Sequence, residues 1–392
     1  MSTIIPPFDQ QICRRNTGSM KWDEDPSIKY PLWVADMDFQ AAPCIIEALR
    51  SRVEHGIFGY ALPLEPYFES IIRWHSNRHG VEYKREWIIP VPGIVPAISA
   101  ILRAMTNPGG GVILFSPAYN CFYSSIRNLQ CRVEECQLIR TEDKAYKIDF
   151  NDLESRAMKT DVTVMLLCSP HNPCGRVWSK EELQRIADIC LRHNVFIISD
   201  EIHCELTMPG YEFIPYASLG EPYLTNSCTC TSASKAFNIA GLQNAQIIIA
   251  NEKIRERIDR AVNIHEVCDI NPMGIVATQA AYSKEGDMWL EQLRQYIWDN
   301  YQAAKTYLVT EIPDIFIADL QATYLMWVDI RSMRMPSDEL CNRMKSEDSV
   351  WFAPGSMYGT GGEGYIRINL ATQHERLMKA VQILKKRRYI GR

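Results

Sequence analysis

The sequence lacks the features that mark membrane, secreted and nucleic-acid-binding proteins. No apolar stretch in its 392 residues is long enough to cross a membrane. The segment from Met1 to Arg15 has two prolines and no apolar core, so we expect no signal peptide. Its 42 lysines and arginines face 47 aspartates and glutamates, a formal net charge of −5, which does not favour nucleic acid as a partner. The basic run Lys385–Arg388 is interpreted as the solvated last turn of a helix.

Repeats, low-complexity segments and disordered linkers are also missing from the sequence. The chain has 13 cysteines, but they are scattered and many stand inside apolar runs. This usage is typical of a reduced, cytoplasmic protein in which thiols serve as small hydrophobes. Cys228 and Cys230 alternate along an expected strand without a second ligand pair, so no metal site is predicted.

The middle of the chain alternates strand and helix patterns. Short apolar runs predict buried strands at Val112–Phe115, Val162–Cys168, Val195–Ser199 and Gln246–Ala250. Ser179-Lys180-Glu181-Glu182 is a capping box, which predicts a helix running to about His193. The repetition predicts an α/β fold with a mostly parallel sheet and helices on both of its faces.

Both ends of the chain differ from this middle part. From about Met288 a helical pattern begins, and strands are expected at Tyr324–Asp329 and Tyr365–Asn369, before a last helix from about Gln373. The apolar face of the first helix is expected to hold Leu290, Leu293, Ile297, Tyr301, Ala304 and Leu308. We therefore predict a large domain of residues 46–287 and a smaller α+β domain built from residues 1–45 and 288–392.

Three polar side chains follow expected strands and carry complementary chemistry. Lys235 ends the run Thr231-Ser232-Ala233-Ser234-Lys235, while Asn172 and Asp200 follow two earlier apolar runs. Open α/β sheets bind ligands at the carboxyl ends of their strands, so these groups are expected to meet. Together these groups favour pyridoxal phosphate (PLP) as a ligand. An amine condenses with its aldehyde, a carboxylate keeps its pyridine nitrogen protonated, and an amide bonds its ring hydroxyl.

Other residues near these three have two interpretations each. His203 either reaches the ring hydroxyl or is a surface histidine. Ser232 and Ser234 either bind phosphate or belong to a plain turn. Gly93-Ile94-Val95 begins an expected helix, where free backbone N–H groups bind phosphate, although many glycine turns precede helices without doing so.

The same ambiguity holds for three more side chains. Tyr119 either stacks on the pyridine ring or packs in the core. Arg367, in an alternating strand, either grips a substrate carboxylate or lies on the surface. Asp200 taken alone is equally compatible with a helix cap or an ion pair.

Several longer motifs carry a resemblance that runs nearly the length of the chain. They are Gly18–Asp23, Leu32–Phe39, Gly56–Tyr60, Pro92–Ala97, Leu167–Pro173, Gly175–Trp178, Ser199–His203 and Phe237–Leu242. With these motifs the chain resembles the fold-type I PLP enzymes of the class I/II aminotransferase superfamily. More narrowly it resembles the MalY/PatB group of cystathionine β-lyases, or carbon–sulfur lyases.

The resemblance implies a role for each candidate residue. It implies that Lys235 is the catalytic, cofactor-bearing lysine, and that the cofactor is further held by Tyr60, Gly93, Ile94, Val95, Tyr119, Asn172, Asp200, His203, Ser232 and Ser234. It implies that Arg367, helped by the backbone near Ala35, binds the substrate. Tyr60 would reach the phosphate of a neighbouring subunit, which implies a homodimer with shared active sites. Before Tyr324 the group usually has glycine, whereas this chain has Ala322-Thr323, and an added methyl is expected to crowd a turn there.

The implied reaction is a β-elimination. Lys235 takes the Cα proton of L-cystathionine or a related cysteine S-conjugate, a thiolate leaves from Cβ, and a thiol, pyruvate and ammonia result. An aminotransferase shares the early steps and is the alternative function. A PLP-binding regulatory protein is the second alternative, although no DNA-binding module is seen before the fold.

Overall fold

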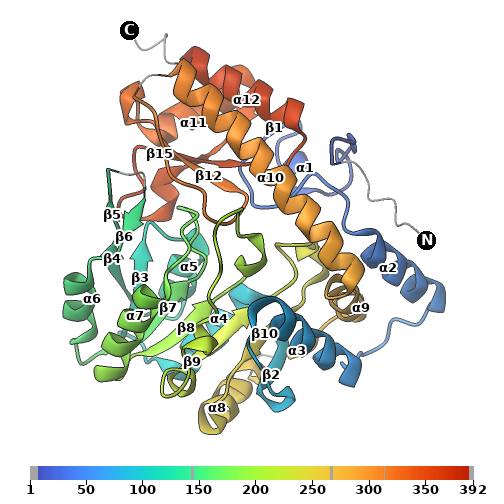
Figure 1. The fold of residues 1–392 in the computed structure, drawn as a ribbon, viewed down its shortest axis with the longest axis vertical. Coiled ribbons are helices and arrows are strands. Elements are labelled where there is room, and N and C mark those ends of the chain that lie inside the picture. The colour runs from blue at the N-terminus through green and yellow to red at the C-terminus, as the bar shows by residue number, and fades with distance from the viewer. Residues whose placement is uncertain (1–7, 143–144, 265–267, 313, 388–392) are drawn as a thin grey trace.

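The fold is described by a computed structural model that covers residues 8–142, 145–264, 268–312 and 314–387 (Figure 1). The expectations for Met1–Pro7 and Arg388 lie outside these residues. None of the helices in the described ranges combines the length and the apolar character that a membrane span requires.

The larger sheet has seven strands, and most of its neighbours are parallel, as predicted. Its order is β2 (Ile88–Val91), β10 (Ala245–Ile248), β9 (Ser227–Thr231), β8 (Phe196–Asp200), β7 (Val162–Cys168), β3 (Gly111–Ser116) and β4 (Arg132–Gln137). Only β10 runs against its neighbours β9 and β2. The connection from β9 to β10 contains no crossover α-helix, so the chain returns in the opposite direction.

Helices cover both faces of this sheet, because both faces of its strands are apolar. Val112 and Leu114 of β3 pack with α4 (Ile94–Met105), α5 (Asn120–Asn128) and α8 (Glu252–Asn263). Ile113 and Phe115 point to the other face and pack with α6 (Phe150–Ala157) and α7 (Lys180–Arg192). The predicted capping box is confirmed, since Ser179 and Glu182 bond each other's backbone at the start of α7.

The smaller sheet gathers the C-terminal strands. Its order is β11 (Phe316–Ile317), β12 (Leu325–Asp329), β15 (Tyr365–Asn369) and β14 (Ala353–Pro354), all antiparallel. The N-terminal segment joins this part of the molecule through β1 (Tyr30–Pro31), which pairs with β13 (Val350–Trp351). The helices around it are α11 (Ser337–Asp348) and α12 (His374–Arg387).

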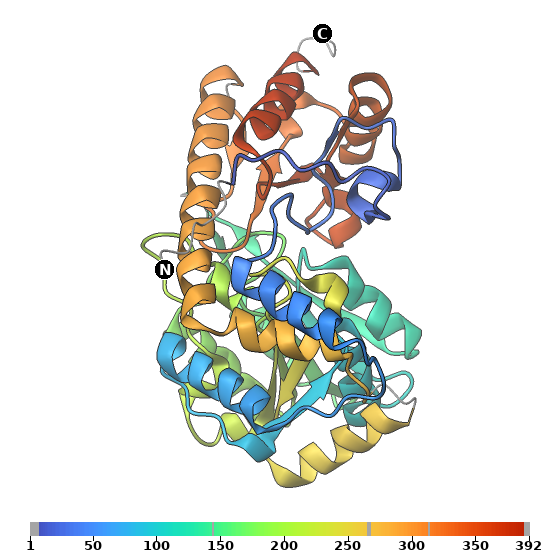
Figure 2. The same ribbon diagram turned by 90° about the vertical axis from the view of Figure 1, so that its right-hand side faces the viewer.

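A long helix, α10 (Lys284–Glu311), starts against α9 (Pro272–Ala281) and extends along the C-terminal part of the molecule, where it packs on α12 (Figure 2). All six apolar residues predicted for its inner face are buried. The helix begins four residues before the predicted Met288, because Ser283 caps it by accepting a hydrogen bond from Gly286 N. Gly286 lies so close to the backbone of Ala281 that no side chain fits there.

Four more α-helices of the described residues come from the N-terminal part of the chain or directly before α10. They are α1 (Met20–Asp23), α2 (Pro43–His55), α3 (Glu65–His79) and α9, and a small hairpin is formed by β5 (Ile139–Arg140) and β6 (Tyr146–Lys147). The proposed domain limits after residues 45 and 287 fall inside α2 and α10. The division remains a proposal, with these two helices as its connections.

Candidate active site

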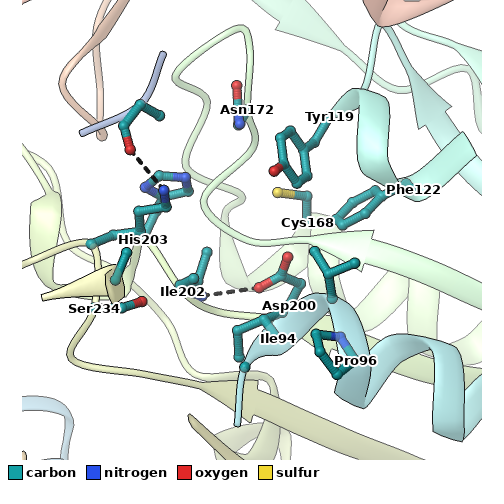
Figure 3. Close-up of a pocket in the computed structure, with 15 residues that line it drawn as sticks. Ile94, Pro96, Tyr119, Phe122, Cys168, Asn172, Asp200, Ile202, His203 and Ser234 are labelled. Atoms are coloured by element: carbon teal, nitrogen blue, oxygen red, sulfur yellow. Dashed lines mark hydrogen bonds between the residues drawn. The ribbon is translucent and has the colours of Figure 1, made fainter. Parts of the chain in front are cut away.

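The carboxyl ends of β7 and β8 and the turn after β9 surround a cavity of about 220 Å³ (Figure 3). Polar groups from three consecutive strand ends therefore meet, as the sequence predicted. The predicted residues that line it are Ala35, Gly93, Ile94, Val95, Tyr119, Asn172, Asp200, His203, Ser234 and Lys235. In the view of Figure 3, His203 and Ser234 lie on one side, Tyr119 and Phe122 on the other, and Asp200 between them.

Asp200 is a buried carboxylate at the end of β8 that receives little hydrogen bonding. Within the described residues, the hydrogen bond that its side chain receives comes from the backbone N–H of Ile202, at 3.2 Å. Burial raises the pKa of Asp200 to about 7, against smaller opposing effects of Ile202 and Lys235. A carboxylate in this setting is stabilised by a cation brought in by a ligand.

Lys235 projects its amine into the same cavity. Its Nζ donates a 2.7 Å hydrogen bond to the carbonyl of Ala35, which also accepts one from the Tyr324 hydroxyl at 3.0 Å. Burial, and next the charge of Arg367, lower the pKa of Lys235 to about 8. The uncharged fraction of the amine near neutral pH is therefore larger than for an ordinary lysine, and this fraction is available as a nucleophile or base.

His203 and Asn172 line the cavity, whereas the predicted Arg367 does not line it and lies in contact with Asn172. Burial, followed by the charges of Lys235 and Arg367, lowers the pKa of His203 to about 3, so the imidazole is neutral. Its Nδ1 is buried without a hydrogen-bond partner among the described residues. Arg367 donates to Asn172 Oδ1 at 3.1 Å and to the Trp33 carbonyl at 3.0 Å. Its Nε has no partner within the same part of the chain, so the guanidinium keeps one donor for a ligand.

The first turn of α4 faces the cavity at its opposite end. Among the described residues no side chain caps this helix, so its leading N–H groups remain available for an anion. Ser234 lines the cavity here, whereas Ser232 does not. The Ser232 hydroxyl instead donates to the carbonyl of Asn244 at 2.6 Å and accepts from Ser234 N at 3.1 Å. These contacts match the turn interpretation of Ser232, and its predicted phosphate contact stays a prediction.

Tyr60 lies outside the cavity and is 101% exposed in the single chain. Large apolar neighbours are exposed beside it, namely Ile57, Phe58, Leu62 and Leu64. Within one chain Tyr60 therefore makes no contribution to the cavity, and its predicted role depends on a second subunit.

The backbone strain expected at Ala322 falls on the next residue. Thr323 has a φ of 74°, a value that β-branched residues rarely adopt, and it is fully buried. Its N–H donates to the Leu206 carbonyl at 2.8 Å and its hydroxyl accepts from Leu325 N at 3.1 Å. These bonds hold the strained residue in place, directly before Tyr324.

Sequence reasoning assigned no role to Ile202, Tyr324 or Trp33. Trp33 and Ile202 act through backbone atoms, for which side-chain identity gives no signal. Tyr324 begins an expected strand, and a buried tyrosine in a strand is ordinarily interpreted as a residue of the hydrophobic core. Its hydroxyl contact with Ala35 depends on chain segments 289 residues apart.

The side chains of the cavity fit pyridoxal phosphate. The buried Asp200 suits a protonated ring nitrogen, the unpartnered His203 Nδ1 and nearby Asn172 suit a ring hydroxyl, and the uncapped α4 suits a phosphate. Lys235 would supply the amine for the aldehyde. Tyr119 is half-buried and lines the cavity, where its ring lies edge-to-face against Phe122, 5.7 Å between centroids.

Known proteins resemble the chain over nearly its whole length. Residues 29–384 match the family Aminotransferase class I and II. Cystathionine beta-lyase PatB of Bacillus subtilis is 39% identical, over 92% of this chain and 94% of the PatB chain. Protein MalY of Escherichia coli is 32% identical, over 95% of this chain and 96% of the MalY chain. The structure of cystalysin from Treponema denticola, which contains pyridoxal 5'-phosphate, aligns with a TM-score of 0.95 at 35% identity over 99% of this chain and 100% of that one. The resemblance inferred from the motifs is confirmed, and the chain belongs to the aminotransferase class I and II family.

Proposed function

We propose that the protein is a PLP-dependent carbon–sulfur β-lyase that acts on L-cystathionine or a related cysteine S-conjugate. The observation that carries this proposal is the meeting of Lys235, Asp200 and the uncapped start of α4 in one cavity. The names of the relatives support the reaction type, since PatB is called a cystathionine β-lyase and cystalysin contains PLP.

Each side chain has a task in this reaction. When bound, PLP supplies an electron sink for the negative charge that develops at Cα of the substrate. Asp200 maintains the positive charge of the ring nitrogen, and the first turn of α4 with Ser234 anchors the phosphate. Lys235, with its pKa lowered to about 8, takes the Cα proton after its amine has been released by the incoming substrate. Water then completes the conversion of cystathionine to homocysteine, pyruvate and ammonia.

The substrate carboxylate is assigned to Arg367. Its guanidinium is already oriented by Asn172 and Trp33, and its Nε is unpartnered among the described residues. A planar guanidinium held from two sides is preorganised for a carboxylate. Ala35, whose carbonyl accepts from Lys235, lines the cavity and would position the substrate from the N-terminal segment.

The enzyme is further proposed to be a homodimer in which Tyr60 completes the partner's phosphate site. Support comes from the exposed apolar group around Tyr60, which a second copy would cover. Mixed dimers of Lys235→Ala and Tyr60→Phe chains should regain activity, because one of their two sites keeps both residues. Mixed dimers of verified composition that stay as inactive as their parents would show that each site is built from one chain.

The reaction itself is tested by following products from L-cystathionine. We expect homocysteine, pyruvate and ammonia in equal amounts, over many turnovers and without any α-keto acid. An aminotransferase would stop after one equivalent and resume only when an α-keto acid is added, which would replace the proposed function. The cytoplasmic location stays a prediction, consistent with 13 cysteines that are all free thiols.

A further inference from the structure

A second cluster of metal-ligating side chains lies between α3 and the segment that follows β8. His75 and His79 stand one turn apart on this helix and face Glu205, and one ligand atom from each lies within 4.8 Å of the other two. Glu205 belongs to the short 3-10 helix Cys204–Leu206, five residues after Asp200. This cluster was not predicted from the sequence, because Glu205 and His79 are 126 residues apart.

One of the three ligand groups lacks a hydrogen-bond partner. His75 is 2% exposed and its Nε2 has no partner among the described residues. A buried polar atom without a partner is costly, and a bound cation would supply that partner.

The ion-paired side chains around the cluster carry more negative than positive charges, which favours a bound cation. Arg78 pairs with Glu205 at 2.8 Å, but the same guanidinium also pairs with Asp287 and Glu291. Arg294 adds one further positive charge on Glu291. Three carboxylates thus share two guanidinium groups. The Trp74 indole and His79 both reach Glu205 Oε1, at 2.6 Å and 2.9 Å, and fix its orientation.

We propose that His75, His79 and Glu205 form a binding site for a first-row divalent cation, for which Zn²⁺ is the best match. Two imidazoles at i and i+4 of a helix with one carboxylate are a set that zinc accepts, with the fourth position left to water. The role of the ion is structural, because the site lies apart from the PLP cavity. It ties α3 to the segment that carries Asp200 and His203, so bound metal stabilises the fold around the cofactor.

The test uses the PLP-loaded protein after removal of metal with a chelator. Zn²⁺ is titrated against a chromogenic chelator, and thermal unfolding is followed with and without Zn²⁺. We expect one tight equivalent per chain and a higher midpoint of unfolding with the metal. His79→Gln, at a partly exposed position, should weaken Zn²⁺ binding roughly tenfold or more and abolish the shift of the midpoint. His75→Gln should have the same effect.

The matched control is His193→Gln. His193 also contacts a carboxylate, Glu154, at 3.2 Å, but no second imidazole is part of that pair in the described structure. This variant should bind Zn²⁺ like the wild type. The proposal is overturned if no stoichiometric Zn²⁺ binds, or if binding survives in His79→Gln, which would place the metal on the free cysteines instead. Retained PLP absorbance verifies that each variant is folded, and neither outcome depends on the proposed lyase reaction.

Discussion

Replacing Asp200 with asparagine should have opposite effects on the cofactor-free and the cofactor-loaded protein. Without PLP the carboxylate is buried with the Ile202 N–H as its hydrogen-bond donor in the described structure, and ionising it is costly. Asparagine fills nearly the same volume and carries no charge. We therefore expect the cofactor-free Asp200→Asn protein to be more stable than the cofactor-free wild type at neutral and alkaline pH.

The size of this stability gain and its pH dependence follow from the pKa of Asp200. A rise from 3.8 to about 7 corresponds to roughly 4 kcal/mol at a pH above both values. Because the folded form holds its proton more tightly than the unfolded form, the wild type loses stability as pH rises between the two pKa values. The advantage of asparagine should grow by roughly 2 to 3 kcal/mol between about pH 5 and pH 8.

Binding of PLP should reverse the sign of the stability difference between Asp200→Asn and the wild type. The ring nitrogen gives Asp200 a positive partner, which asparagine cannot match, so the variant should bind PLP more weakly and react more slowly. A loss of several kcal/mol in the barrier is on the order of one preorganised electrostatic contact. Glu201→Gln is the matched control, since burial also raises the pKa of Glu201 to about 7, but its carboxylate accepts from Ser199 and Tyr216 outside the cavity.

Urea unfolding at fixed protein concentration, with and without PLP, measures these differences from pH 5 to pH 8. Glu201→Gln should gain stability with pH in both forms, whereas Asp200→Asn should gain only in the cofactor-free form. A cofactor-free Asp200→Asn protein without a pH-dependent gain, or a loaded variant as active as the wild type, would contradict the role assigned to Asp200.

Three further changes test other parts of the site. Lys235→Ala should lower pyruvate formation by at least about 10⁴-fold, and borohydride reduction with peptide mapping should place the pyridoxyl group of the wild type on Lys235; a label on another lysine would contradict the assignment. Reloading of the cofactor-free protein with PLP should speed up as pH rises through about 8, because only the neutral Lys235 amine reacts, and Asp200→Asn should move that midpoint slightly downwards, because the charge of Asp200 raises the pKa of Lys235; a rate that is flat in this range would argue against a lowered pKa. Thr323→Gly should be about 1 kcal/mol more stable than Thr323→Ala in urea unfolding, the reverse of the usual order, because the φ of 74° suits glycine; the usual order would show that the turn is not strained.

Much of the fold was predictable because its strands are buried on both faces and its helices are amphipathic. The run Val162–Cys168 became β7 with the predicted limits, and the Ser179 capping box marked the start of α7. The reversed direction of β10 was not predicted, since it depends on the missing crossover helix after β9 rather than on the strand's own residues.

The candidate site was predictable where one residue type is tied to one chemical task. Lys235, Asp200 and Asn172 follow strands, and the topology of a parallel sheet brings such residues together. The two interpretations of Ser232 can be distinguished only when the position of Asn244 is known. The contacts of Arg367 likewise depend on the position of Trp33. Such contacts between distant segments leave no pattern in a single sequence.

The long helix α10 has a mechanical consequence for the enzyme. Its 28 residues form a rod about 42 Å long, which starts against α9 and packs on α12 along its course. A rod of this kind acts as a lever, and a tilt of about 5° at its base displaces the far end by about 4 Å. The fulcrum is the contact of Gly286 with Ala281, where no side chain fits. A small tilt beside the larger sheet would thereby be enlarged where α10 packs on α12.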